Sequence, residues 1–123
     1  MESGVFSKDK EIKKEITKLK KIFGDLEGRS KEVSLKLMEE LAFLKIEMTG
    51  LKQHVKEFGS VDEMEQGEYT ILRTSPYYKN YLDAAKTYTT IYKQILDLYP
   101  KEVAVSKSNE LDDLQTFLKK HSK

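Results

Sequence analysis

Cysteine and tryptophan are absent from this chain of 123 residues, and proline occurs only twice. Without cysteine the chain can form neither disulfides nor thiolate metal sites, and it has no thiol nucleophile. With so few prolines, little in the sequence interrupts a long helix. The fold must therefore be held together without disulfides or thiolate metal sites, and the few prolines favour helices.

Long apolar runs are also missing. No segment approaches the ~20 apolar residues that a membrane-spanning helix needs, and residues 1–6 contain no apolar run of signal-peptide length. The mean hydropathy is −0.62. We expect a cytoplasmic protein whose residues 1–6 form a disordered N-terminus.

Groups that carry catalysis are scarce. The two histidines, His54 and His121, have neither a histidine four residues away nor an H-E-x-x-H context, so we interpret them as surface or packing residues. Asp62, Glu63 and Glu65 could surround a cation, but a solvated acidic segment is the commoner reading of such a run. We expect no enzyme activity, no cofactor and no metal.

Charged residues make up 35% of the chain and apolar residues 38%, a balance that favours helices. The first periodic segment, residues 7–23, has Ser7 as a candidate N-cap and Gly24 as a candidate stop. Its apolar positions recur at helical spacing: Ile12, Ile16, Leu19 and Phe23. At ~100° per residue, Lys10, Lys14 and Lys21 fall opposite this stripe.

Lysines are concentrated in the same segment. Residues 8–21 carry seven lysines against three acidic side chains, a net charge of +4, whereas residues 59–75 carry four acidic side chains against one arginine, a net charge of −3. A lysine face can neutralise phosphates, although such faces are also common as plain solvated surface. The candidate DNA-binding residues are Lys10, Lys13, Lys14, Lys18, Lys20 and Lys21.

Two longer amphipathic segments follow. The first opens near Ser30 and has apolar residues in heptad order, and Gly59 ends it: Val33, Leu37, Leu41, Leu44, Met48, Leu51, Val55 and Phe58. The second starts at the N-cap and N1 pair Ser75-Pro76 and runs until Pro100: Tyr77, Tyr81, Ala84, Tyr88, Ile91, Ile95 and Leu98. Residues 59–75 between them predict an acidic loop with its tightest point at Gln66-Gly67.

We therefore predict an all-α, oligomeric protein, built on a long antiparallel helical hairpin with an N-terminal basic amphipathic helix and a short C-terminal helical segment. Residues 7–100 form the DNA-binding and oligomerisation domain. The expected core and oligomer residues are Leu37, Leu41, Leu44, Met48, Leu51, Tyr81, Tyr88 and Ile95. We expect the aliphatic helix to form the core within the chain and the tyrosine-rich helix to supply much of the contact between subunits. Tyrosines can stack on nucleobases, but heptad placement favours packing.

Residues 101–123 predict a flexible tail with one short amphipathic segment, for which Asn109 is a candidate cap. About 10 residues is marginal for an isolated helix, so this segment orders only when it docks. Its apolar face either covers the chain's own hairpin or docks on a partner. The candidate docking residues are Leu111, Leu114, Phe117 and Leu118.

Three groups of short motifs follow one another over residues 9–101: Lys10-Glu11-Ile12-Lys13-Lys14-Glu15-Ile16 with Leu19-Lys20-Lys21-Ile22-Phe23; Leu37, Glu40, Ala42, Phe43 and Leu51-Lys52; and Gln66-Gly67, Ser75-Pro76, Tyr88, Lys93-Gln94 and Asp97-Leu98-Tyr99-Pro100-Lys101. The order of these motifs resembles the small subunit of phage terminases, of the kind found in tailed phages of Gram-positive bacteria.

The resemblance implies a ring-forming, non-catalytic subunit in the host cell cytoplasm. Such a subunit binds viral double-stranded DNA and regulates the large terminase subunit, which carries the ATPase and the nuclease, during genome packaging. The alternative from the residues alone is a coiled-coil-like helical adaptor or structural assembly protein that does not bind nucleic acid.

Overall fold

The computed structural model describes the backbone of residues 4–121 and the side chains of residues 8–120. Over this range the chain forms five helices and one two-stranded sheet. In order they are α1 (Gly4–Ile22), α2 (Gly28–Phe58), β1 (Val61–Gln66), β2 (Tyr69–Thr74), α3 (Pro76–Leu96), α4 (Lys101–Ser106) and α5 (Asn109–His121). The sequence predicted an all-α protein; the chain is mostly helical, and the two-stranded sheet departs from that prediction.

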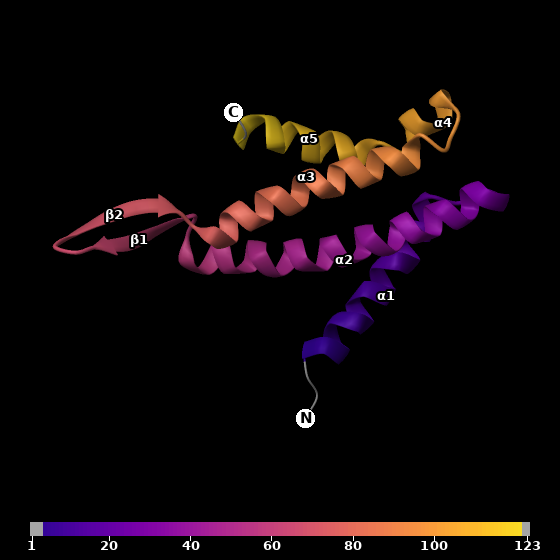
Figure 1. The fold of residues 1–123 in the computed structure, drawn as a ribbon. Helices are drawn as coiled ribbons and strands as arrows, with labels where there is room; N and C mark the ends of the chain where they lie inside the picture. The colour runs from indigo at the N-terminus through magenta and orange to yellow at the C-terminus, as the bar shows by residue number, and fades with distance from the viewer. Residues whose placement is uncertain (1–3, 122–123) are drawn as a thin grey trace.

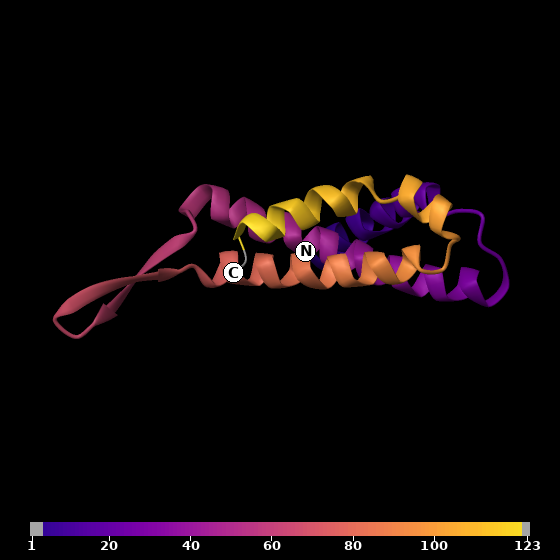
Figure 2. The same ribbon diagram turned by 90° about the horizontal axis from the view of Figure 1, so that it is seen from above.

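The body is assembled around α2 and α3, which run in opposite directions and pack along their length (Figure 1). Helix α1 crosses α2 obliquely and packs on it, with Phe23 at its C-terminal end reaching Tyr92 of α3, and α5 lies along α3 (Figures 1 and 2). Both central helices therefore have more than one neighbour. A helix between two neighbours buries a wider stripe than one heptad seam provides.

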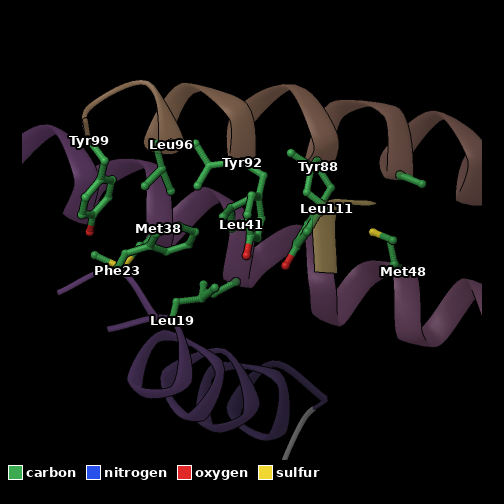
Figure 3. Packing of buried hydrophobic residues seen from close by; sticks show 13 residues of the cluster. Leu19, Phe23, Met38, Leu41, Met48, Tyr88, Tyr92, Leu96, Tyr99 and Leu111 are labelled. Carbon is green, nitrogen blue, oxygen red and sulfur yellow. The ribbon is translucent and has the colours of Figure 1, made fainter. Parts of the chain in front are cut away.

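This wider stripe is visible in the core, which draws on α1, α2, α3, α5 and the turn after α3 (Figure 3). On α2 the buried residues are Ser34, Met38, Leu41, Ala42 and Met48. The predicted seam members Val33 and Phe58 are exposed, as is Tyr77 on α3. Within one chain these three seam members are not covered, because the buried face of α2, which includes Ser34, Met38 and Ala42, is rotated from the heptad line.

Four of the eight predicted core residues are buried: Leu41, Met48, Tyr88 and Ile95. Three more are partly buried and pack against this core: Leu37, Leu44 and Tyr81. Leu51 is half-buried and lies outside the cluster. The core set was thus largely predicted. The expectation that the aliphatic helix alone forms the core within the chain is wrong, since Tyr88 and Tyr92 of α3 lie at its centre.

The start of α3 follows the predicted chemistry. Ser75 is the N-cap, its Oγ accepts hydrogen bonds from the backbone N–H groups of Tyr77 and Tyr78, and Pro76 occupies N1. At the other end the helix stops at Leu96 rather than at Pro100. Two i to i−3 backbone bonds, from Leu98 and Tyr99, form a tight turn there before the proline.

Helix starts were predicted less well. Helix α1 begins at Gly4, so Ser7 is not its N-cap, and residues 4–6 are helical rather than disordered; residues 1–3 of that expected segment lie outside the described residues. Helix α2 begins at Gly28 after Glu27, ahead of Ser30. Each helix begins before its candidate cap because serine is also tolerated inside a helix.

Residues 59–75 are not the loop that the sequence predicts. They form an antiparallel hairpin in which Val61 pairs with Thr74 and Gln66 with Tyr69, and we call residues 61–74 the β-arm. Gly67 has a φ of 66°, which places the tightest point where it was expected. In Figure 1 the β-arm projects from the end of the body where α2 ends and α3 begins.

The tail is more regular than predicted. It forms α4 and α5, and α5 packs along α3 rather than leaving the body. Ser108 directly precedes α5, its carbonyl accepts the N–H of Asp112, and its hydroxyl lies 3.3 Å from that residue's carboxylate. Asn109 is already the first residue of the helix, so it is not the cap.

Candidate nucleic-acid interface

The lysine face of α1 is built on an apolar stripe that fixes the helix to the body. Leu19 and Phe23 are almost fully buried, and Ile12 and Ile16 are partly buried against the same core. The Phe23 ring meets the Tyr92 ring edge-on at 5.0 Å between centroids. Because the apolar side of α1 is occupied in this way, its opposite side faces solvent.

All six candidate lysines of α1 are exposed. By helix geometry Lys10, Lys14 and Lys21 lie opposite the apolar stripe, whereas Lys13 and Lys20 lie on its flank. Lys14 is 3.7 Å from Glu11, one turn earlier on the same helix. Among the described residues, no carboxylate lies within ion-pair distance of the other five, Lys10, Lys13, Lys18, Lys20 and Lys21. The structure therefore brings the predicted set together as a mostly unpaired basic surface, which is the arrangement that contact with phosphates requires.

A seventh lysine of α1 has a different role. Lys8 forms an ion pair with Glu47 of α2 at 3.2 Å. Side chains this exposed contribute little to stability. Lys8, which is not among the six candidate residues, is thus engaged with α2.

The C-terminal end of α1 is held by groups that the sequence analysis missed. The Tyr99 hydroxyl donates to the carbonyl of Gly24 at 2.7 Å, and Lys107 Nζ donates to the carbonyl of Ile22. The partial negative charge at the C-terminal end of α1 also stabilises the Lys107 ammonium group at this position. These contacts join residues 75 and 85 positions apart, so no local pattern could have indicated them.

Two tyrosines of α3, Tyr88 and Tyr92, are packed in the core and do not offer free rings. Tyr88 and Tyr92 are each 1% exposed. The Tyr88 hydroxyl donates to the Glu110 carboxylate at 3.0 Å, and the Tyr92 hydroxyl donates to the backbone carbonyl of Lys107 at 2.9 Å. Burial raises the pKa of Tyr92 to about 12. Burial, followed by the charge and hydrogen bond of Glu110, also raises the pKa of Tyr88. In this arrangement neither ring can stack on a nucleobase or reach a second subunit.

Glu110 is the centre of a small polar cluster that anchors α5. It accepts from Tyr88 and also from Lys45 Nζ of α2 at 3.1 Å. The cluster therefore connects α2, α3 and α5. Its members are 22 and 65 positions from Glu110, which is why sequence spacing did not reveal it.

The four candidate docking residues of the tail face their own body. Leu111 is buried in the core, Leu114 and Leu118 are partly buried against it, and Phe117 meets the Tyr81 ring edge-on at 6.0 Å. Of the two alternatives that the sequence left open, the structure has the one in which this face covers the chain's own helices. Docking of the same face on a partner would require α5 to leave α3.

The described histidine and acidic side chains are dispersed over the fold. His54 stacks on Tyr77 at 3.6 Å between ring centroids, and its Nδ1 is buried with no hydrogen-bond partner among the described residues; the side chain of His121 lies outside them. Asp62 is 3.7 Å from Arg73 across the β-arm. Within residues 8–120, no three histidine, aspartate or glutamate side chains gather as metal ligands would.

None of the helices within residues 4–121 combines the length and the apolar character that crossing a bilayer demands.

Comparison of the sequence with protein-family models and with curated proteins, and of the structure with solved structures, gives no match.

Proposed function

We propose that this protein is a DNA-packaging subunit of the terminase small-subunit type, which binds viral double-stranded DNA through α1 and regulates a large subunit that carries the ATPase and nuclease. The observation that carries the proposal is the set of exposed lysines on α1, of which five lack an ion-pair partner among the described residues. The order of motifs over residues 9–101 supports the same family. In this role the chain itself is non-catalytic and works in the host cell cytoplasm.

Recognition by such a surface is electrostatic. Each lysine that neutralises a phosphate releases a counterion, so affinity grows with the number of contacts and falls with salt. From Lys10 to Lys21 the helix rises about 16 Å at ~1.5 Å per residue, so the face can follow several phosphates. Single-copy binding of this kind is weak, and several assembled copies would raise it through effective concentration. Assembly of copies is therefore part of the proposal.

Charge reversal tests the assignment. Lys10, Lys14 and Lys21 are changed together to Glu, and affinity for duplex DNA is measured by fluorescence anisotropy at low salt. Because three attractive contacts become repulsive, we expect affinity to fall at least about a hundredfold. The matched control changes Lys36, Lys86 and Lys93 to Glu, which alters the net charge equally; these lysines are also exposed but lie on α2 and α3. Equal losses in both variants would refute a specific role for α1.

The second candidate function is a helical adaptor or structural assembly protein without a nucleic-acid role. It is favoured by one observation, the large apolar side chains that remain exposed on and beside the β-arm. Wild-type protein that assembles but retains no DNA at low salt would select this function over the first.

A further inference from the structure

The β-arm leaves an apolar surface uncovered. Four of its large side chains are well exposed: Val61, Tyr69, Ile71 and Leu72, the last at 70%. The two strands pair with each other, and neither makes a substantial contact with any described helix. An isolated two-stranded hairpin is only marginally stable in water. Exposed apolar side chains concentrated on one projection indicate an interaction site.

The two faces of the β-arm differ in character. The register places Met64, Ile71 and Tyr69 on one face, together with Gln66 and the Asp62–Arg73 ion pair. The other face carries the exposed Val61 and Leu72 beside Glu63 and Glu65. Both faces of the β-arm thus expose apolar side chains, and on the second face these lie next to acidic residues that have no ion-pair partner among the described residues.

A groove of matching character lies on the body. Its volume is about 480 Å³, and it is formed by the C-terminal half of α2, the N-terminal half of α3, and α5. Met48, Val55 and Leu114 give it an apolar lining, and the exposed Lys52 and Lys56 stand in its wall. We call it the α2–α5 groove.

Charge in the groove is available for a partner. Of its lysines, Lys45 already pairs with Glu110 at 3.1 Å. Among the described residues, no carboxylate lies within ion-pair distance of Lys52 or Lys56, and Asp113 is the one further acidic side chain in the lining. An apolar segment with acidic residues beside it suits such a groove.

We propose that the α2–α5 groove of one copy receives the β-arm of a second copy. Only Gly59 and Ser60 separate the β-arm from α2. Its six-residue strands extend about 20 Å at ~3.3 Å per residue. Figures 1 and 2 show that it points away from the body, so its tip does not reach its own groove. The contact joins two different surfaces, and repeating it from copy to copy generates a ring or a chain.

This inference rests on the proposed assembly of copies and is independent of the proposed DNA binding. It can be tested by cross-linking, which the absence of cysteine makes clean. Chains with Tyr69→Cys are mixed with chains carrying Lys56→Cys, treated with a short bis-maleimide and analysed by mass spectrometry. We expect a cross-linked heterodimer at several times the yield obtained when Tyr69→Cys is mixed with Lys101→Cys, a change on α4 at the opposite end of the body. Equal yields would overturn the contact.

A charge exchange adds a second readout. Changing Glu63 and Glu65 to Lys, or Lys52 and Lys56 to Glu, places like charges together and should weaken assembly at least about tenfold by light scattering. A chain carrying both changes should recover assembly, because the charges are complementary again. Failure of the combined chain to recover, or a wild-type protein that remains monomeric, would overturn the proposal.

The control and the DNA readout separate the two proposals. Changing the exposed Glu32 and Glu39 of α2 to Lys alters the net charge as the β-arm change does, and should leave assembly unaffected. A wild-type protein that forms the cross-link but does not bind duplex DNA at low salt would refute the proposed function and not the arm contact. A wild-type protein that binds DNA but forms the cross-link no better than the Lys101→Cys control would refute the arm contact alone.

Discussion

Helix α5 should undock and unfold, while the rest of the fold stays intact, when its buried side chain Leu111 is truncated. The change is Leu111→Ala, at a side chain that is 4% exposed and belongs to the core. Truncating a buried leucine to alanine costs about 2–5 kcal/mol, from lost burial and from the cavity left behind. The polar contacts of Glu110 with Lys45 and Tyr88 remain and do not fill that cavity.

This loss should act locally rather than on the whole fold. Helix α5 has 13 residues, which is marginal for a helix in isolation, and its substantial helix contact is with α3. A cost of about 2–5 kcal/mol raises the population of the undocked state by about 30-fold to about 4,000-fold. Helices α2 and α3 keep most of their shared core in that state.

Hydrogen exchange by mass spectrometry measures this effect directly. Amides of residues 109–121 should exchange faster by the stated factor, whereas those of α2 near Leu41 should keep their protection. The control is Val105→Ala, whose side chain is 68% exposed and should change neither. Unchanged protection of α5, or an equal loss of protection throughout α2 and α3, would refute the argument.

Further outcomes follow from single features. Gly67→Ala places a side chain at a φ of 66° and should lower the hydrogen-exchange protection of the β-arm amides. Gly50→Ala lies in the interior of α2 with open space around it, and it should raise the free energy of unfolding by up to about 1 kcal/mol. Ser75→Ala removes the N-cap of α3 and should cost about 1 kcal/mol in urea unfolding. Because the folded state raises the pKa of Tyr88 and Tyr92, the latter to about 12, these tyrosines stabilise the fold fully below the unfolded-state pKa of about 10. Unfolding free energy should fall as pH rises from about 10 towards 12, and changing either tyrosine to Phe should reduce that fall.

The helices and most of the core could be predicted from the sequence, because they depend on local periodicity. The spacing of Leu41, Met48, Tyr88 and Ile95 identified the buried side of the two central helices. Periodicity alone does not say how many neighbours a helix has. This is why membership of the heptad series did not reveal that Phe58 is 66% exposed within one chain.

The β-arm was missed although the sequence held a signal for it. Tyr69-Thr70-Ile71-Leu72-Arg73-Thr74 is rich in β-branched and aromatic residues, and the two-residue link Gly67-Glu68 suits a hairpin. The acidic residues of the first strand obscured this pattern. An acidic strand is tolerated here because most of its side chains face solvent.

The basic surface was predicted from helix geometry, whereas its supports were not. Placing lysines opposite an apolar stripe requires only the angle per residue. The contacts of Tyr99 and Lys107 with the end of α1 depend on the tertiary fold, and so does the meeting of Lys45 with Glu110. Such contacts between distant positions leave no mark in the spacing of a single sequence.

The central claim is that α1 binds DNA through its lysines, and salt dependence tests it most directly. Affinity for duplex DNA is measured from about 50 to about 200 mM salt for the wild type and for a chain in which Lys10, Lys14 and Lys21 are changed to Gln. We predict that the logarithm of the affinity falls linearly with the logarithm of the salt concentration. In the Gln variant the slope of this line should be smaller in magnitude by about 0.9 for each phosphate contact removed. A slope that is the same in both chains, or a wild-type protein that does not bind at the lowest salt, would contradict the claim.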